Sequence, residues 1–297
     1  MVGQHTPVLS KEVIDLLQLK SDNDFIDATL GFGGHAAEVL GETTPRGRML
    51  GVELDWETAD AARAALARFG DRVQVVVGNY RDLDRIARKS GWERTQGILF
   101  DLGFSSATLK RGRGFSFMGD EALDMRYGEG ELTAAHIINS WTVDELERIF
   151  REFGDEDRAR SIAHGIIKAR KAGRILTTGA LVGVIASTYG GRSRRIHPAT
   201  KVFQALRIAV NDEFGNLRTA LPKAVSLLAP GGRIAVISFH SGEDRIVKNF
   251  FRDEDHAGRL RILTKRPVVP GAEEIMMNPR ARSAKLRVAE KRTVMAG

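Results

Sequence analysis

The stretch Phe25-Ile26-Asp27-Ala28-Thr29-Leu30-Gly31-Phe32-Gly33-Gly34-His35 decides the fold of this 297-residue chain. Its apolar beginning predicts a strand, its glycines predict a tight turn, and the residues that follow, to about Leu40, predict a helix. Strand, glycine-rich turn and helix in this order are typical of a parallel sheet that binds a ligand at the carboxyl edge of its strands.

Strands and helices alternate on both sides of this stretch, which predicts an α/β fold with a doubly wound, mostly parallel, Rossmann-like sheet. We expect seven strands, the last of which pairs antiparallel with its neighbours. The predicted strands lie at residues 25–28, 48–54, 73–77, 98–102, 234–239, 260–263 and 286–289.

The alternation is interrupted after Asp101. Residues 133 to about 195 carry only helical patterns, and the strand pattern then resumes. We therefore predict one α/β domain formed by residues 1–105 and 206–297, with a helical domain inserted at 106–205.

The charge is distributed unevenly along the chain. The net charge is +7, from 45 basic and 38 acidic residues, but residues 1–104 carry 12 basic and 16 acidic residues. Between Arg158 and Asn211 there are 11 Lys and Arg and no Asp or Glu. An acid-free segment of this length favours a polyanionic partner such as nucleic acid, although a solvated basic face is the alternative.

Composition excludes several classes of protein. The chain has no cysteine, which removes disulfides, iron–sulfur clusters and thiol nucleophiles. It has no signal-peptide pattern and no apolar run of about 20 residues, so we expect a cytoplasmic protein. The histidines His35, His197 and His240 are widely separated in the sequence, and no metal site is expected from them.

Polar residues follow the predicted strands at the edge where a ligand is expected. Glu53 and Asp55 end the second strand about 20 residues after the glycine turn, where a carboxylate can accept both hydroxyls of a ribose. Either carboxylate fits, and both favour an adenosine-containing cofactor. The glycine spacing D-x-x-x-G-x-G-G is not that of dinucleotide-binding proteins and is closer to the loop that binds S-adenosylmethionine, which has no pyrophosphate.

Two further groups end the fourth and fifth strands. Asp101 is followed by Ser105 and Ser106, small polar residues that can orient an amino group, although helix capping would explain the serines equally well. His240 follows the fifth strand at the same edge, where a structural role is the alternative to a catalytic one.

These residues together resemble one family, the bacterial small-subunit ribosomal RNA cytosine-N4 methyltransferases of the MraW type. The resemblance covers nearly the whole chain. It is carried by His5-Thr6-Pro7-Val8-Leu9, the Asp27–His35 loop, Asp101-Leu102-Gly103 with Ser105-Ser106, Arg113-Gly114-Phe115-Ser116-Phe117, Leu123-Asp124-Met125-Arg126, His197-Pro198-Ala199-Thr200-Lys201, Phe203-Gln204-Ala205-Leu206-Arg207-Ile208, Asn211, Leu228-Ala229-Pro230-Gly231-Gly232-Arg233, Ser238-Phe239-His240-Ser241, Glu243-Asp244-Arg245 and the segment from Asn278 to Arg287.

The resemblance implies an enzyme that uses S-adenosyl-L-methionine to methylate the exocyclic N4 of a cytosine in 16S ribosomal RNA, with an inserted domain that helps to bind the RNA. The implied cofactor contacts are Gly33, Gly34, His35, Asp55, Tyr80, Asp101 and Thr108. The family often has Phe where this chain has Tyr80, Gln where it has Thr108, and usually Leu where it has Gly242.

The candidate catalytic residues are Asp101, Ser105 and His240, and no covalent intermediate is expected. The candidate RNA-binding residues are Arg192, Arg194, Arg195, Lys201 and Arg207. The expected partner is ribosomal RNA of the small subunit or its assembly particle, with no membrane partner, and the oligomeric state, including a homodimer, is left open. Two alternatives are a non-catalytic RNA-binding assembly factor and a methyltransferase acting on amino groups of DNA.

Overall fold

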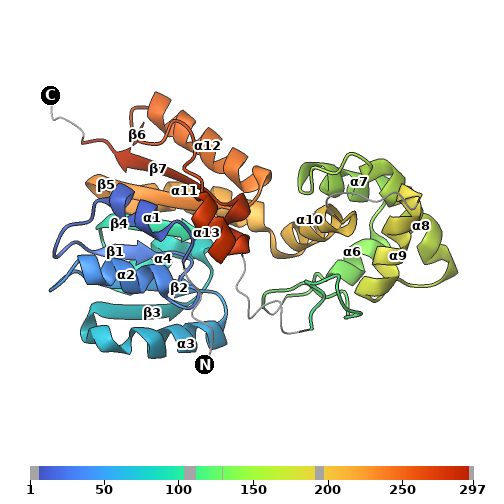
Figure 1. The fold of residues 1–297 in the computed structure, drawn as a ribbon, viewed down its shortest axis with the longest axis horizontal. Coiled ribbons are helices and arrows are strands. Elements are labelled where there is room, and N and C mark those ends of the chain that lie inside the picture. Colours follow the sequence, from blue (N-terminus) through green and yellow to red (C-terminus); the bar gives the residue numbers. More distant parts are fainter. Residues whose placement is uncertain (1–6, 104–111, 129, 191–196, 294–297) are drawn as a thin grey trace. The chain divides into compact units, whose positions relative to one another are not determined.

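The computed structural model describes residues 7–103, 112–128, 130–190 and 197–293 (Figure 1). It divides into two compact units, one formed by Met1–Gly103 with Phe214–Gly297 and one formed by Phe104–Glu213. The sequence predicts the second boundary after residue 205. This boundary lies later in the structure because helix α10 (Ala199–Asn211), which was not predicted, belongs to the inserted unit.

The first unit is built on one seven-stranded sheet with the order β3-β2-β1-β4-β5-β7-β6. Strands β1 to β5 pair in parallel, and β7 lies antiparallel between β5 and β6. The predicted fold class, a doubly wound and mostly parallel sheet with an antiparallel last strand, is confirmed. The strands are β1 Phe25–Asp27, β2 Met49–Glu53, β3 Val73–Val77, β4 Thr95–Asp101, β5 Leu228–Ser238, β6 Leu260–Ile262 and β7 Lys285–Lys291.

Helices cover both faces of this sheet and create two apolar layers. Leu83 of α4, Leu221 of α11 and Phe251 of α12 belong to one layer, whereas Val13 of α1 and Leu40 of α2 belong to the other. Because the strands are buried on both faces, they are apolar at nearly every position rather than at alternate ones. The helices are α1 Ser10–Leu17, α2 Gly34–Glu42, α3 Trp56–Leu66, α4 Leu83–Lys89, α11 Glu213–Leu227, α12 Ser241–His256 and α13 Ala272–Met277, with 3₁₀ turns at Ala67–Arg72, Tyr80–Asp82 and Pro279–Ser283.

The fifth strand starts earlier than the sequence predicts. The predicted strand covers residues 234–239, whereas β5 begins at Leu228, and its pairing with β4 shifts register between Thr95 and Gly97. Between the last two strands, where no element was predicted, the structure has α13 and a 3₁₀ turn. Both regions contain proline or glycine, which local patterns assign to turns.

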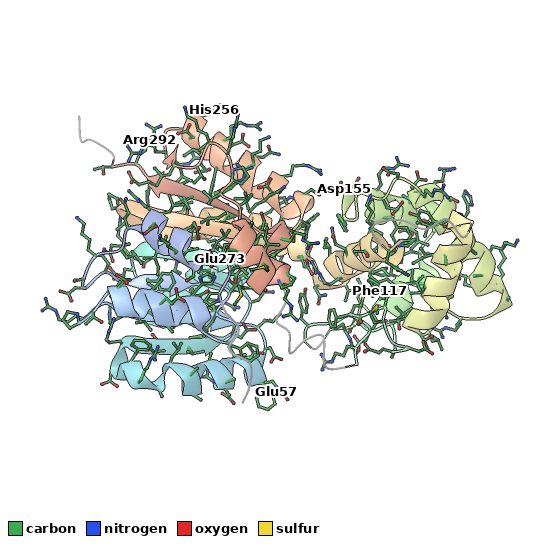
Figure 2. The ribbon with its side chains drawn as sticks, viewed as in Figure 1. Glu57, Phe117, Asp155, His256, Glu273 and Arg292 are labelled. Atoms are coloured by element: carbon green, nitrogen blue, oxygen red, sulfur yellow. The ribbon has the colours of Figure 1, made fainter. Side chains whose placement is uncertain are left out.

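The inserted unit is helical and has its own core. It contains α6 Ala134–Ser140, α7 Val143–Glu152, α8 Ala159–Ala172, α9 Thr178–Tyr189 and α10. Ile149, Ile162 and Leu206 are fully or almost fully buried in this core. Phe117, which is labelled in Figure 2, packs against the same core. Its ring stacks on that of His197 with the ring centroids 4.8 Å apart. No helix among the described residues is long and apolar enough to span a membrane.

Candidate active site at the carboxyl edge of the sheet

The glycine turn after β1 is a backbone cradle. Gly31 and Gly33 have φ angles of 53° and 81°, in the left-handed region that favours glycine. A Cβ at Gly33 would lie 2.9 Å from the side chain of Leu66, so a side chain is excluded for a second reason. Gly33 caps α2, and the first residues of that helix therefore present their backbone N–H groups at the sheet edge.

The carboxylate of Glu53 joins the glycine turn to the end of β2. Its Oε2 accepts a hydrogen bond from Gly31 N at 2.9 Å, and its Oε1 accepts one from Asp55 N at 2.9 Å. Burial raises the pKa of Glu53, and the two backbone donors oppose this effect. Each carboxylate oxygen has two lone pairs, so Glu53 keeps acceptor capacity for a ligand.

Asp55 also caps the N-terminus of a helix. Its Oδ1 accepts hydrogen bonds from Thr58 N at 2.9 Å and from Thr58 Oγ1 at 2.8 Å, which makes it the N-cap of α3. The sequence left the choice between Glu53 and Asp55 open, and the family resemblance selected Asp55. The geometry favours Glu53 as the ribose acceptor, because its carboxylate is bonded to the glycine turn itself.

A buried chain of titratable groups crosses the centre of this edge. His35 Nε2 lies 3.5 Å from Asp101 Oδ2, and the His35 side chain is 6% exposed. Burial lowers the pKa of His35, but the nearby Asp101 carboxylate outweighs this and the pKa is raised. Burial also raises the pKa of Asp27, which is 1% exposed, to about 7, partly opposed by the charge of His35.

Thr29 connects two of these titratable residues, Asp27 and Asp101, through hydrogen bonds. Its backbone N donates to Asp27 Oδ1 at 3.1 Å, and its Oγ1 accepts from Asp101 N at 2.6 Å. The end of β4 is therefore tied directly to the turn after β1. Nothing in the spacing of the sequence indicates this contact, because it joins residues 72 positions apart.

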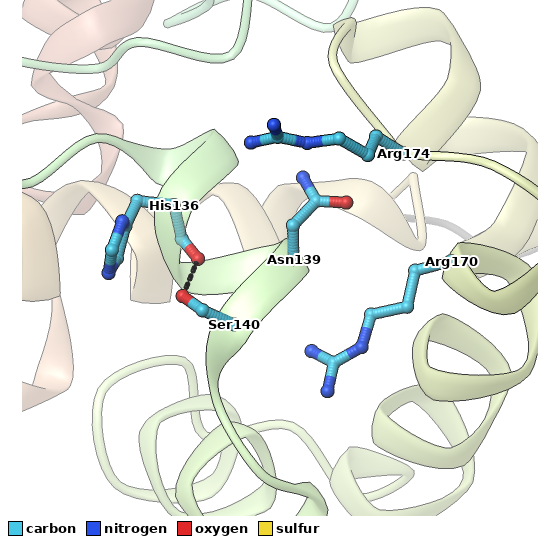
Figure 3. Close-up of a pocket in the computed structure, with 5 residues that line it drawn as sticks. All are labelled: His136, Asn139, Ser140, Arg170 and Arg174. Atoms are coloured by element: carbon cyan, nitrogen blue, oxygen red, sulfur yellow. Dashed lines mark hydrogen bonds between the residues drawn. The ribbon is translucent and has the colours of Figure 1, made fainter.

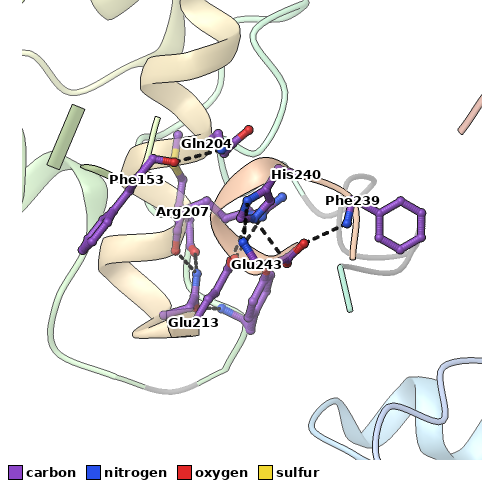
Figure 4. Close-up of polar contacts among 10 residues, drawn as sticks. Phe153, Gln204, Arg207, Glu213, Phe239, His240 and Glu243 are labelled. Atoms are coloured by element: carbon purple, nitrogen blue, oxygen red, sulfur yellow. Dashed lines mark hydrogen bonds and ion pairs between the residues drawn. The ribbon is translucent and has the colours of Figure 1, made fainter. Parts of the chain in front are cut away.

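His240 sits at the end of β5 and begins α12. Its Nδ1 accepts from Glu243 N at 3.4 Å, and its Nε2 lies 3.2 Å from Glu243 Oε1. The other carboxylate oxygen of Glu243 accepts from Phe239 N at 2.9 Å (Figure 4). A Cβ at Gly242 would lie 2.4 Å from the ring of Phe214, so the packing of that ring requires the glycine found where the family usually has Leu.

The arrangement fits a small adenosine-containing cofactor. Asp101 Oδ1 is buried and has no hydrogen-bond partner among the described residues, as expected of a group that awaits a ligand. Tyr80 begins the 3₁₀ turn after β3, and its ring meets that of Phe100 edge-on at 5.8 Å. An aromatic ring in this position can contact a purine.

Several residues predicted for the site fall outside the described residues. These are Ser105, Thr108, Arg192, Arg194 and Arg195.

The other two predicted RNA contacts are engaged within the inserted unit. Arg207 forms a bidentate ion pair with Glu213 at 2.8 and 2.9 Å, and Lys201 Nζ donates to the carbonyl of Asp155 (Figure 4 shows the Arg207 pair). The side chains of Arg207 and Glu213 are only 13% and 11% exposed. The charge of Arg207 is thus already compensated, which disfavours a role in binding phosphate.

Comparison with known proteins now decides the family. A model of the MraW methylase family matches residues 3–292. The chain belongs to the MraW methylase family. The resemblance predicted from the sequence is therefore confirmed.

Three relatives match the MraW methylase chain over nearly its full length. "Ribosomal RNA small subunit methyltransferase H" of Thermomicrobium roseum is 46% identical over 97% of this chain and 93% of its own. Proteins of the same name from Geobacter sulfurreducens (46%; 98% and 100% covered) and Persephonella marina (43%; 97% and 99%) match equally completely.

Proposed function

We propose that this chain uses S-adenosyl-L-methionine to methylate the exocyclic N4 of a cytosine in small-subunit ribosomal RNA. One observation carries the proposal: a match to a methylase family over residues 3–292. A buried oxygen of Asp101 that has no hydrogen-bond partner among the described residues supports it. The names of the relatives support the choice of ribosomal RNA.

The cofactor is held by the first unit. Gly33, whose own N–H donates to the carbonyl of Leu30 at 2.9 Å, shapes the turn. Gly34 offers its backbone N–H to the methionine part of the cofactor beside His35, and Glu53 accepts the ribose hydroxyls. Tyr80 contacts its adenine. When bound, the cofactor supplies an electrophilic methyl group on a sulfonium sulfur. Its positive charge fits an edge where carboxylates gather.

The residues of this chain must make a poor nucleophile reactive. The lone pair of a cytosine amino group is delocalised into the ring, so the nitrogen has to be turned toward the methyl carbon. Asp101 Oδ1 accepts a hydrogen bond from the amino group and holds it in this orientation. As the N–C bond forms and the C–S bond breaks, the nitrogen loses a proton, for which His240 and Ser105 are further candidate acceptors.

The RNA is held by basic residues of the inserted unit and by the C-terminal segment of residues 258–297, which carries 10 basic and 3 acidic residues. The acid-free stretch from Arg158 to Asn211 supports this assignment, and Arg192, Arg194 and Arg195 are its most clustered cations. The target base has to leave its stack to reach the methyl group, so phosphate contacts must hold the strand meanwhile. A ribosomal RNA substrate implies work in the cytoplasm, on free RNA or on an assembling particle.

Transfer of tritium from labelled S-adenosyl-L-methionine tests the function. We expect label in 16S ribosomal RNA and none in DNA of the same sequence. Label in DNA alone would establish the amino-methyltransferase of DNA instead. Binding of RNA without transfer of label to RNA or DNA would establish the non-catalytic assembly factor.

A further inference from the structure

The inserted unit contains a basic pocket whose lining residues all belong to that unit. A cavity of about 340 Å³ is lined by His136, Asn139 and Ser140 of α6, by Arg170 of α8 and by Arg174, which follows that helix (Figure 3). We call this cavity the α6–α8 pocket. Figure 3 shows Arg170 and Arg174 on either side of Asn139.

The wall of the α6–α8 pocket is fixed by hydrogen bonds to the backbone. Asn139 Nδ2 donates to the carbonyl of Ile175 at 2.8 Å, and its Oδ1 accepts from Ile175 N at 2.9 Å. Arg170 Nη1 donates to the carbonyls of Ile138 and Trp141 at 2.9 and 2.7 Å, at the end of α6. One guanidinium is thus held in place before any ligand arrives.

The charges of the pocket are not compensated by carboxylates. Neither Arg170 nor Arg174 forms an ion pair with any residue that the structure describes. By contrast, Arg151 and Arg160 of the same unit both pair with Glu147.

The sequence explains why no carboxylate is near. Residues 132–143, which include α6, and residues 158–211, which include α8 and Arg174, contain no Asp or Glu. Asn139 uses both amide hydrogens on carbonyls, and Ser140 donates to the carbonyl of His136. The donors left for a ligand are those of the guanidinium groups and the imidazole ring, and guanidinium forks match the oxygens of a phosphate.

We propose that the α6–α8 pocket binds one phosphate group of the RNA substrate, held by Arg170 and Arg174 with His136 at its rim. The proposal rests on the proposed function, because that function makes RNA the polyanion that this unit meets. The volume of the pocket accommodates a phosphate together with part of its ribose. The site adds a fixed contact point on the RNA strand.

The test replaces Arg174, since Arg170 also supports the end of α6 and its loss would disturb folding. In the full chain, Arg174→Ala should raise the KM for RNA about tenfold, because a hydrogen-bonded charge contact is lost. The log–log salt slope of RNA binding should fall by about 0.7, the value for one contact to a single strand. Arg174→Lys, which keeps the charge without the fork, should lie between wild type and alanine.

A matched control removes a basic side chain from α8, the helix that precedes Arg174. Arg160→Ala deletes an arginine that pairs with Glu147 and does not line the pocket, so RNA affinity and salt slope should stay at wild-type values. Wild-type methyl transfer with an unchanged KM and slope in Arg174→Ala would overturn the phosphate site and leave the proposed function intact. Absence of methyl transfer to RNA by the wild type would overturn both.

Inorganic phosphate serves as a second probe, which distinguishes a pocket that binds a phosphate group of RNA from one that binds free phosphate. Phosphorus NMR should show weak phosphate binding to the wild type that Arg174→Ala abolishes, and RNA should displace the bound phosphate. If phosphate binding depends on Arg174 but RNA neither displaces it nor binds less tightly to the variant, the pocket takes free phosphate and the proposal is wrong.

Discussion

The carboxyl edge of the sheet and the α6–α8 pocket are built in opposite ways. At the sheet edge Asp27, His35 and Asp101 are buried or half-buried and linked through short polar contacts. In the pocket the cations Arg170 and Arg174 face no carboxylate of the described residues. The difference follows the ligand: a small cofactor that carries a sulfonium charge needs a shaped, acidic site, whereas a long polyanion needs uncompensated positive charge.

The largest expected effect concerns Asp101. Asp101→Asn should lower kcat at saturating cofactor about 100-fold, because a neutral amide holds the amino group less firmly and accepts no proton. Asp60→Asn, which changes an exposed carboxylate on α3, is the control and should have wild-type kcat. Single-turnover methyl transfer measures both. A kcat within threefold of wild type in Asp101→Asn would remove this residue from the reaction.

The next effect distinguishes the two carboxylates after β2. Glu53→Gln should weaken cofactor binding by at least about tenfold, since a charged acceptor of the ribose hydroxyls is lost. Asp55→Ala should mainly lower the free energy of unfolding by about 1 kcal/mol, because α3 loses its N-cap. Calorimetry measures the cofactor affinity of both variants, and urea unfolding measures their free energy of unfolding. The reverse pattern would return the ribose contact to Asp55.

A smaller effect is expected beside His240. Gly242→Leu should lower the free energy of unfolding by about 1–3 kcal/mol, because its side chain would overlap the ring of Phe214. Adding Phe214→Ala should recover part of this loss by opening space for the leucine. Urea unfolding of both single variants and the double variant measures the coupling. Strict additivity of the two changes would contradict the proposed overlap.

The last effect is a dependence on pH. The folded pKa of Asp27 is about 7, above its ordinary value of 3.8, so the folded state binds the extra proton between these values and wild-type stability falls as pH rises from about 4 to 7. Asp27→Asn should remove this loss, so its stability relative to wild type should rise between pH 4 and pH 7 and level off above that range. Equal pH dependence of the two proteins in urea unfolding would show that Asp27 ionises freely.

Much of the fold could be predicted because its strands are runs of buried apolar residues. Val73–Val77 was predicted with its observed bounds, and helices on both faces followed from the alternation. The start of β5 at Leu228 could not be recognised, because proline and glycine near its beginning suggested a turn. Helix α10 could not be recognised, because it follows a basic segment that suggested irregular structure. Long-range pairing decided these regions, and local patterns do not record it.

The sequence predicts where the candidate site lies, but not which of its residues form hydrogen bonds with one another. The glycine turn, Asp101 and His240 were assigned to one edge because parallel strands end there together. The roles of Glu53 and Thr29 depend on contacts that cross from one strand end to another, such as Glu53 to Gly31. Sequence spacing does not reveal such contacts.

The identity of the methylated nucleoside tests the central claim most directly. Wild-type protein is incubated with 16S ribosomal RNA and deuterium-labelled S-adenosyl-L-methionine, and the RNA is digested to nucleosides for chromatography and mass spectrometry. The account predicts the label in N4-methylcytidine, with a rate of labelling about 100-fold lower for Asp101→Asn under the same conditions. Label in 5-methylcytidine or in a ribose-methylated nucleoside, with none in N4-methylcytidine, would contradict it.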